Sequence, residues 1–446
     1  MAYPFEIKEH ILPGQHIRRY PRATAQNQHD TLKVVYKQYR PFDNPTPSPG
    51  DITIIGAHAN GFPKELYEPL WEEIYQLLKS KNKAIRGIWI ADVAHQGQSG
   101  VLNEDKLGND PSWFDHPLDL LHMVNVFRDE MIRPIVGIGH SLGGNNLVNL
   151  ALLHPRLMES LILIDPVIQR AASVQGNYMP AMLSSRRREV WPSRREAAEA
   201  AKKSKFYQSW DLRVLERWLE HGLRDIPTAL FPGTPSTTLN SEATTSTPVT
   251  LKTTKHQEVF TFLRPNFRTI GVEPDIKPEL IVTTSHNRDP VGHADYDPTS
   301  GLANAPFYRA EPIITFNRLP HLLPSVLYIF GETSTLSRPE LRSDKMAVTG
   351  VGVGGSGGAP ADRVKEVVVK GVGHLIPMEA PKETAQHSTK WLEAEIRVWN
   401  EREARERKEW DSVPSSEKTK LSEAYMSMLH SDESLSSKGK KTKAKL

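Results

Sequence analysis

The chain has 446 residues, of which 38% are hydrophobic and 24% charged, proportions typical of a globular protein with a large core. Its formal net charge of +3 is small for this length and gives no reason to expect nucleic acid as the main partner. The absence of cysteine excludes disulfides, a thiol nucleophile and a cysteine-bound metal. The charged start, MAYPFEIKEHILPG, is unlike a secretory signal, and no run of about 18 apolar residues predicts a transmembrane helix.

Short apolar runs, most of them β-branched, predict strands that are buried on both faces. They are residues 32–36, 52–55, 88–91, 135–138, 161–164, 326–330 and 367–369. Between them, residues 66–78 and 118–131 carry apolar residues at helical spacing. Strands that alternate with helices indicate a doubly wound, mostly parallel α/β sheet.

The alternation stops after Asp165, and the next predicted strand follows only after about 155 residues, too long for a structureless loop in a compact domain. We therefore expect an inserted, largely helical cap. Residues 184–224 predict its helical part, with an apolar face that includes Trp210 and Trp218. Residues 234–254, crowded with Ser, Thr and Pro, predict a flexible surface loop within it.

These boundaries divide the chain into four predicted parts. Residues 1–165 form the N-terminal half of the core, residues 166–320 the cap, and residues 321–400 the C-terminal half of the core. Residues 401–446 continue a long charged helix into a Ser/Lys-rich tail that we expect to be disordered.

The strongest chemical signal is the segment Gly139-His140-Ser141-Leu142-Gly143, which matches Gly-x-Ser-x-Gly. It follows the predicted strand PIVGI and precedes the helical NNLVNLALLH, as the sharp turn of an α/β-hydrolase fold requires. The glycines make room for a strained elbow that lifts the Ser141 hydroxyl out of the sheet. The same turn aims the backbone N–H of Leu142 at a developing oxyanion.

A serine hydroxyl needs a base, and a late histidine after the last strand is the expected one. His374 follows the predicted strand at 367–369 in the loop Gly371-Val372-Gly373 and meets this expectation. A second oxyanion donor should come from the loop after the strand at 52–55, where the backbone N–H of Asn60 is the candidate. His58 in the same loop is expected to order the backbone.

Two acids compete for the third position of the triad. Hydrolases of this fold commonly place Asp in Gly-x-x-Asp after a late strand, but here Gly331-Glu332-Thr333-Ser334 has Ser at that position. Glu332 stands two residues early. The other known position follows the strand after the nucleophile helix, where Asp165 is available to orient the imidazole. We favour Asp165 and keep Glu332 as the alternative.

Two further features of the sequence bear on binding. A cluster of possible metal ligands in the cap matches no known ligand spacing, so we expect neither a metal nor any other cofactor. Its members are His286, Asp289, His293, Asp295 and Asp297. The chain ends with Ala444-Lys445-Leu446, a small-basic-Leu tripeptide of the kind that the peroxisomal import receptor reads.

Together, HANGFPKELYEPLW, WIADVAHQGQSG, GHSLGG, LILIDP, VGVGGSGG and VKGVGHLIPMEAP resemble a group of fungal α/β-hydrolases. This group includes peroxisomal enzymes of host-selective toxin clusters and a yeast peroxisomal lipase. The resemblance covers nearly the whole chain apart from the tails and the Ser/Thr-rich cap loop. It implies a serine hydrolase of the peroxisome matrix that acts on fatty acyl or polyketide-like acyl esters, such as those of secondary-metabolite or toxin biosynthesis.

We therefore predict a lipase- or carboxylesterase-type serine hydrolase in the peroxisome, with a small-molecule acyl substrate and no cofactor. The close alternative is an acyl-CoA thioesterase, with Arg186, Arg187 and Arg188 of the cap meeting the phosphates of CoA. Against this, such a run can simply form a solvated helix face. An acyltransferase and a non-catalytic binder of the same fold are the remaining alternatives.

Overall fold

The computed structural model describes residues 3–171, 178–233, 247–270, 279–282, 291–296 and 305–431. They fall into two compact units, Met1–Glu395 and Ile396–Leu446. The sheet and all candidate catalytic residues lie in the first unit. The terminal tripeptide, Ala444 to Leu446, lies outside the described residues.

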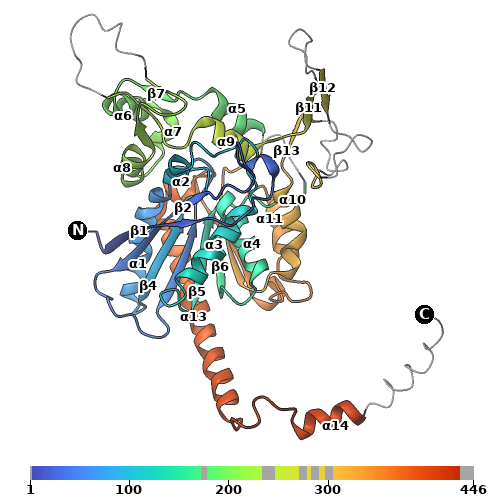
Figure 1. Ribbon diagram of the computed structural model, residues 1–446. Coiled ribbons are helices and arrows are strands. Elements are labelled where there is room, and N and C mark those ends of the chain that lie inside the picture. Colours follow the sequence, from blue (N-terminus) through green and yellow to red (C-terminus); the bar gives the residue numbers. More distant parts are fainter. Residues whose placement is uncertain are drawn as a thin grey trace, which may run out of the picture. The chain divides into compact units, whose positions relative to one another are not determined.

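An eight-stranded sheet forms the centre of the first unit, in the order β1-β2-β4-β3-β5-β6-β14-β15 (Figure 1). Its strands are β1 (Phe5–Pro13), β2 (Lys33–Pro41), β3 (Ile52–Ala57), β4 (Ile85–Ala91), β5 (Ile135–His140), β6 (Ser160–Ile164), β14 (Ser325–Gly331) and β15 (Val364–Val369). All strands from β4 to β15 pair in parallel, whereas β1 and β2 add an antiparallel edge. The predicted α/β-hydrolase architecture is confirmed. Strand β1 was not predicted, because most of its residues are at least partly exposed and form no apolar run.

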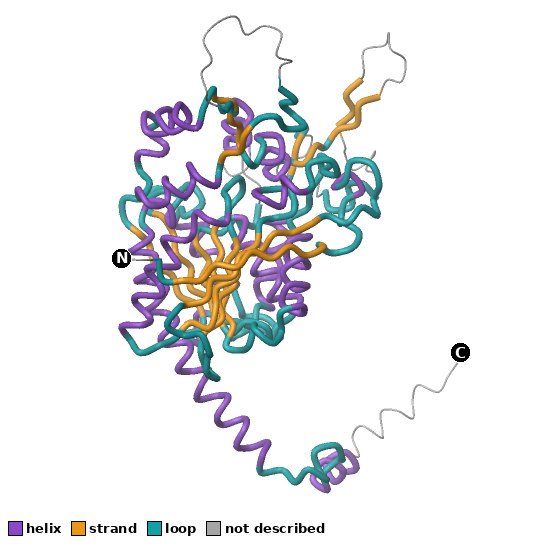
Figure 2. Tube along the Cα trace, turned by 60° about the vertical axis from the view of Figure 1, so that its left-hand side comes forward, coloured by secondary structure: helices purple, strands orange, loops and turns teal. Residues whose placement is uncertain are grey.

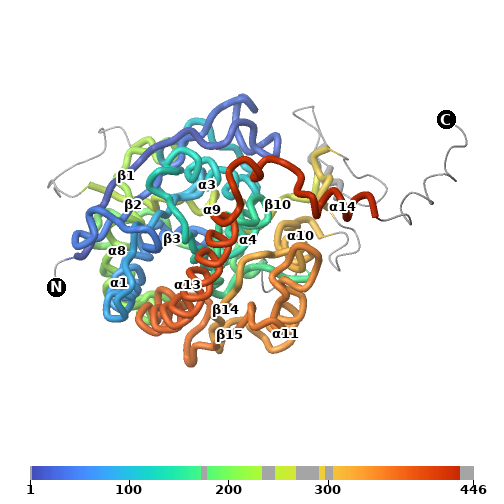
Figure 3. Tube along the Cα trace, turned by 90° about the horizontal axis from the view of Figure 1, so that it is seen from below, coloured from blue at the N-terminus to red at the C-terminus, as the bar shows by residue number. Residues whose placement is uncertain are grey.

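Helices cover both faces of this sheet, which is why β3 and β6 are buried along their whole length. Figure 3 shows α1 (Glu68–Ser80) and the first part of α13 (Pro381–Asp411) on one side. On the other side lie α3 (Asp115–Val126), α4 (Leu142–Leu153) and α10 (Glu311–Arg318). The remaining short helices of the core are η1 (Pro21–Ala23), η2 (Lys64–Tyr67), α2 (Gly97–Leu102), η4 (Leu319–His321), α11 (Pro339–Val348), η5 (Ala359–Ala361) and α12 (Ile376–Glu379).

The described segments between β6 and α10 form a layer of short helices and small sheets above the central sheet (Figures 1 and 2). Its helices are α5 (Met179–Arg186), α6 (Arg194–Lys203), α7 (Lys205–Gln208), α8 (Leu212–His221) and α9 (Lys255–Phe262). Its strands are β7 (Val190–Trp191), β8 (Leu223–Asp225), β9 (Val249–Leu251), β10 (Arg264–Pro265), β11 (Phe267–Ile270), β12 (Glu279–Val282) and β13 (Phe307–Tyr308).

Two expectations for this layer need correction. The predicted helical stretch 184–224 is broken into several short helices and strands. The predicted loop 234–254 is wrong at its end, because Val249–Leu251 forms the buried middle strand of the sheet β7-β9-β8. Val249 and Leu251 are apolar and pack inward, a signal that the neighbouring Ser, Thr and Pro residues concealed. Residues 234–246 lie outside the described residues.

Polar contacts attach the layer to the core. The backbone N–H of Asp211 donates to the carbonyl oxygen of Met378 at 2.8 Å. Arg213 at the start of α8 donates to Glu73 of α1 at 2.9 Å. These contacts hold α8 against the core and keep the layer in a defined position above the sheet.

The second unit contains, among its described residues, the end of α13 and the helix α14 (Glu423–Ser431). The prediction that a long charged helix continues past residue 401 is confirmed, because α13 runs to Asp411. A search of the described helices found none with the length and apolar character needed to span a membrane.

Candidate active site

Ser141 occupies the sharp turn between β5 and α4. Its φ of 56° and ψ of −115° are strained for a residue with a side chain. The flanking glycines are required by close approaches. A Cβ on Gly143 would lie 2.1 Å from the carbonyl oxygen of Ala57, and one on Gly139 would lie 2.6 Å from that of Gly143. The local sequence thus produces the elbow by leaving no room for side chains beside Ser141.

A hydrogen-bonded chain joins three residues that are far apart in the sequence. The Ser141 hydroxyl lies 2.9 Å from Nε2 of His374, in the loop after β15. Nδ1 of His374 lies 2.6 Å from Oδ2 of Asp165, directly after β6. Asp165 is fully buried and Ser141 is 6% exposed. This geometry suits transfer of the serine proton to the imidazole, whose Nδ1–H is held by the carboxylate.

The two candidate acids have different surroundings. Asp165 contacts His374, whereas Glu332 accepts a hydrogen bond at 2.9 Å from the backbone N–H of Gly371. Ser334, at the Gly-x-x-Asp position, donates its hydroxyl proton to Oδ2 of Asp165. Sequence reasoning missed Ser334 as a site residue, although it noted that a serine stands where an acid is common.

The loop after β3 places Asn60 beside Ser141 in one cavity. Within the described part of the chain, the backbone N–H groups of Asn60 and Leu142 have no hydrogen-bond partner and are available to an oxyanion. The Asn60 side chain is engaged, since its amide donates to the carbonyl oxygen of Glu258 and accepts from Gln96. These bonds fix the loop between the core and α9.

Both ring nitrogens of His58 bind backbone groups, which is the structural role expected for it. Nε2 accepts from the N–H of Val93 at 2.9 Å, and Nδ1 donates to the carbonyl oxygen of Ala59 at 2.8 Å. Burial lowers the pKa of His58 and keeps the ring neutral. The ring therefore orders the loop that carries Asn60.

A second histidine lies inside the Gly-x-Ser-x-Gly motif. His140 is buried, and Nε2 lies 2.8 Å from the carbonyl oxygen of His374. Its Nδ1 lies 2.9 Å from the hydroxyl of Tyr67, which in turn accepts the N–H of Ala59. Burial lowers the pKa of His140 to about 3, so the ring stays neutral and can donate and accept at once. The pattern of the motif does not reveal this connection.

Ser141 opens into a cavity of about 720 Å³ between the core and the cap layer. Its walls are mostly apolar and include large side chains from both layers. These are Phe62, Val167, Leu183, Trp191, Phe206, Trp218, Phe262, Leu336 and Leu375. A volume and lining of this kind suit a small ligand with an apolar chain.

The three consecutive arginines of the cap, residues 186–188, have different surroundings. Arg187 is ion-paired with Glu258 at 2.8 Å and is committed to the wall of the cavity. Arg188 also lines the cavity, and its guanidinium lies over the ring of Trp191. Arg186, at the end of α5, is exposed.

The metal cluster weighed in the cap is only partly described. Asp295 is ion-paired with Arg264 at 2.8 Å and accepts a hydrogen bond from Tyr308 at 2.9 Å. His293 lies beside Tyr308. His286, Asp289 and Asp297 lie outside the described residues. Among the described residues, no group of three or more possible ligands could hold a metal ion.

The sheet order, the serine elbow and the Ser-His-Asp chain are those of a serine hydrolase built on a doubly wound sheet. The chain belongs to the alpha/beta hydrolase family, whose model matches residues 54–387.

Three fungal proteins of known name are similar to this chain over most of its length. A type I acyl-CoA thioesterase, mpaH, of Penicillium roqueforti is 43% identical over 88% of both chains. Its namesake from Penicillium brevicompactum is 45% identical over the same shares. An abhydrolase domain-containing protein of Alternaria alternata, AFT2-1, is 27% identical over 68% of this chain and 99% of its own.

Among solved structures, the peroxisomal alpha-beta-hydrolase Lpx1 from Saccharomyces cerevisiae covers 99% of both chains. Its TM-score is 0.62 and its sequence identity 16%, so it supports the fold alone. These relatives and this neighbour confirm the resemblance to fungal α/β-hydrolases found in the sequence.

Proposed function

We propose that the chain is a serine hydrolase that cleaves acyl-CoA thioesters, with Ser141 as the nucleophile. The observation that carries this proposal is the hydrogen-bonded chain Ser141-His374-Asp165 at one wall of an apolar cavity. The names of relatives at 43–45% identity favour the thioester over the oxygen ester that the sequence first suggested. The oxygen ester remains the second candidate.

In the proposed reaction, His374 takes the proton of Ser141 as the hydroxyl oxygen attacks the acyl carbonyl. The N–H groups of Leu142 and Asn60 stabilise the oxyanion, and Asp165 holds the imidazolium. The C–S bond then breaks, and the departing sulfur takes the proton from His374. Water then attacks the acyl-enzyme while His374 takes its proton, and His374 returns that proton to the oxygen of Ser141 as the ester bond breaks and the acid is released.

The cavity supports an apolar acyl group as the other part of the substrate. Trp191 and Trp218 line it from the cap layer, and Phe62 lines it from the core. Of the three arginines considered for phosphate binding, Arg188 suits the role better than Arg187, which is already paired with Glu258. We also propose that the predicted cap, residues 166–320, covers this site, except for α10 and the start of η4 at its end, which belong to the core.

Matched substrates test the proposal. Purified protein should hydrolyse acyl-CoA faster than an oxygen ester with the same acyl chain, and Ser141→Ala should hydrolyse neither. Faster turnover of the oxygen ester would favour a carboxylesterase or lipase. Transfer of the acyl group to an added alcohol, in preference to water, would favour an acyltransferase.

A fluorophosphonate probe separates an enzyme from a non-catalytic binder. We expect the probe to label wild type at Ser141 and to leave Ser141→Ala unlabelled, because only an activated hydroxyl reacts. Folded protein that resists labelling and turns over no substrate would support the binder.

We further propose that the enzyme works in the peroxisome, on acyl substrates of secondary-metabolite or toxin biosynthesis. The support for the location is Ala444-Lys445-Leu446, a tripeptide of the type read by the peroxisomal import receptor. A fluorescent protein fused before the first residue should enter peroxisomes. Removal of the tripeptide should leave the fusion outside them.

A further inference from the structure

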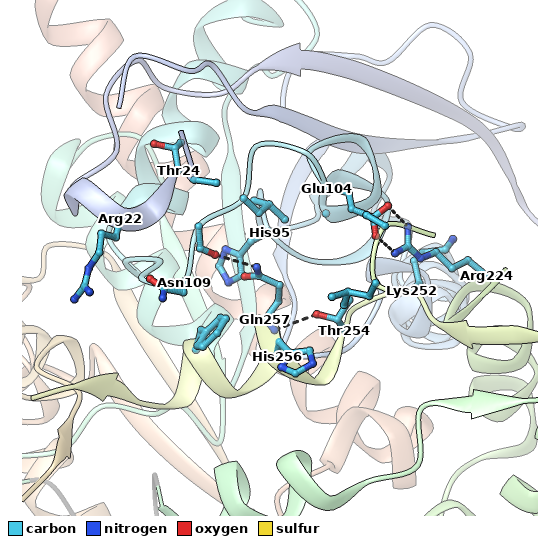
Figure 4. A pocket seen from close by; sticks show the side chains of 17 residues that line it. Arg22, Thr24, His95, Glu104, Asn109, Arg224, Lys252, Thr254, His256 and Gln257 are labelled. Carbon is cyan, nitrogen blue, oxygen red and sulfur yellow. Dashed lines mark hydrogen bonds and ion pairs between the residues drawn. The ribbon is translucent and has the colours of Figure 1, made fainter. Parts of the chain in front are cut away.

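A second cavity, of about 610 Å³, lies along α9 (Figure 4) and shares no lining residue with the catalytic cavity. Glu258 and Phe262, four residues apart on one side of α9, line the catalytic cavity. Gln257 and Phe260, on another side, line the second. One helix therefore separates two cavities, and none of the proposed catalytic residues lines the second.

The charged residues of the second cavity are mostly cationic. They are Arg22, Arg224, Lys252 and Glu104. Arg224 is ion-paired with Glu104 (Figure 4). Among the described residues, neither Arg22 nor Lys252 forms an ion pair, so the charges that line the cavity sum to a net positive charge. A bound anion would balance it.

Of the two cations without an ion pair, Lys252 is the one that we expect to contact a bound anion. It is half-buried between β9 and α9, and burial lowers the pKa of its ammonium group because the charged form loses water. The carboxylates of Glu65 and Asp92 partly offset this effect from the core side. On the cavity side, Figure 4 places Thr254 next to Lys252, and the hydroxyl group of Thr254 adds a polar neighbour.

The rest of the lining is suited to a larger organic group. Leu107, Leu230 and Phe260 give apolar surface, while Asn109 and Gln257 give side-chain amides. Apolar walls with a few polar groups are typical of small-molecule sites, and an aromatic ring offers a stacking surface for a planar base. The volume exceeds that of an inorganic ion many times over.

We propose that this cavity binds a nucleotide-type organic phosphate, with its phosphate against Lys252 and its base against the apolar wall at Phe260. The proposal concerns binding and does not depend on the hydrolase activity. Free CoA, adenosine diphosphate and inorganic phosphate share the phosphate group. Separate titrations with these three ligands distinguish them.

The experiment is calorimetric titration of the full-length protein with adenosine diphosphate, free CoA or inorganic phosphate. Wild type should bind adenosine diphosphate clearly more tightly than inorganic phosphate. Lys252→Met, which keeps the apolar stem and removes the charge, should weaken adenosine diphosphate binding about tenfold or more. Lys252→Arg should retain it, and thermal melting of each variant checks folding.

Lys370→Met is the matched control, because Lys370 is an exposed lysine that lines neither cavity. It should leave adenosine diphosphate binding unchanged. The proposal is overturned if adenosine diphosphate does not bind, or if inorganic phosphate binds as tightly. It is also overturned if Arg188→Met abolishes binding that Lys252→Met retains, since the ligand would then occupy the catalytic cavity. Binding of free CoA without binding of adenosine diphosphate would also place the ligand in the catalytic cavity and overturn the proposal.

Discussion

The ring of His140 donates a hydrogen bond from Nε2 to the backbone carbonyl oxygen of His374, across 2.8 Å. The residue before the nucleophile thus holds the loop that carries the proposed base. Through Nδ1 the same ring binds Tyr67, whose hydroxyl accepts the N–H of Ala59 next to Asn60. One buried imidazole connects the base loop to the oxyanion loop.

Replacing this imidazole tests its positioning role. We expect His140→Phe to lower kcat by about 10- to 100-fold, with little change in KM, because small displacements of a base or donor are costly in the transition state. Steady-state kinetics and the rate of fluorophosphonate labelling should fall together. Tyr67→Phe, which removes only the hydroxyl, should have a smaller effect. Unchanged labelling of folded His140→Phe would contradict the role.

The choice between the two acids gives a paired prediction. Asp165→Asn should lower kcat by about 10⁴-fold, because an amide can hold the imidazole in the wrong tautomer. Glu332→Gln should leave kcat within about twofold, since the amide oxygen can still accept from Gly371 and exposed polar substitutions are generally mild. Kinetics of both variants decide the assignment. A large loss in Glu332→Gln with a small one in Asp165→Asn would reverse it.

Ser334 offers a finer test of the same carboxylate. Ser334→Ala removes the hydroxyl that donates to Asp165. Hydrogen bonds to charged groups are worth about 1.5–3 kcal/mol, so the carboxylate should hold His374 less precisely and kcat should fall about tenfold. The pH profile of kcat should shift as well. If the pH profile of kcat is unchanged and only the thermal stability falls, the role of Ser334 is purely structural.

Lys345 predicts an unusual pH dependence of stability. Its side chain is 1% exposed, donates to the carbonyl oxygen of Leu341, and has a pKa lowered by burial to about 8. Between about pH 8 and the ordinary value of 10.5, the unfolded chain binds a proton that the folded chain does not. Stability from this group should therefore rise with pH across that window.

Lys345→Met should remove that rise and should increase the free energy of unfolding at pH 7 by roughly 2 kcal/mol. Denaturant titrations at pH 7, 8 and 9.5 measure both effects. Lys370→Met, at an exposed lysine, controls for the loss of one positive charge. If the free energy of unfolding depends on pH in the same way for wild type and Lys345→Met, the buried ammonium group of Lys345 is not the cause of the pH dependence.

Local patterns were enough to predict the elbow at Ser141. A strand, a tight turn and a helix are all specified within a few residues, and glycine is needed wherever backbones approach closely. The buried strands were predicted for the same reason, because covering both faces leaves a continuous apolar run. The cap was harder, since β9 and its partners are short and owe their stability to pairing with distant residues.

Short-range sterics and hydrophobicity act within each segment, so the doubly wound sheet, the elbow and the candidates His374, Asp165 and Glu332 could be predicted from local sequence. Which acid meets His374 depends on how the strands pair across the sheet. Strands β6 and β14 lie side by side in parallel, with Ile164 opposite Ile329, so the residues beyond their ends converge. That pairing brings Ser334 to Asp165, and the loop after β15 brings His374 to the same carboxylate. Neighbouring strands that are distant in sequence leave no local signal of such a contact.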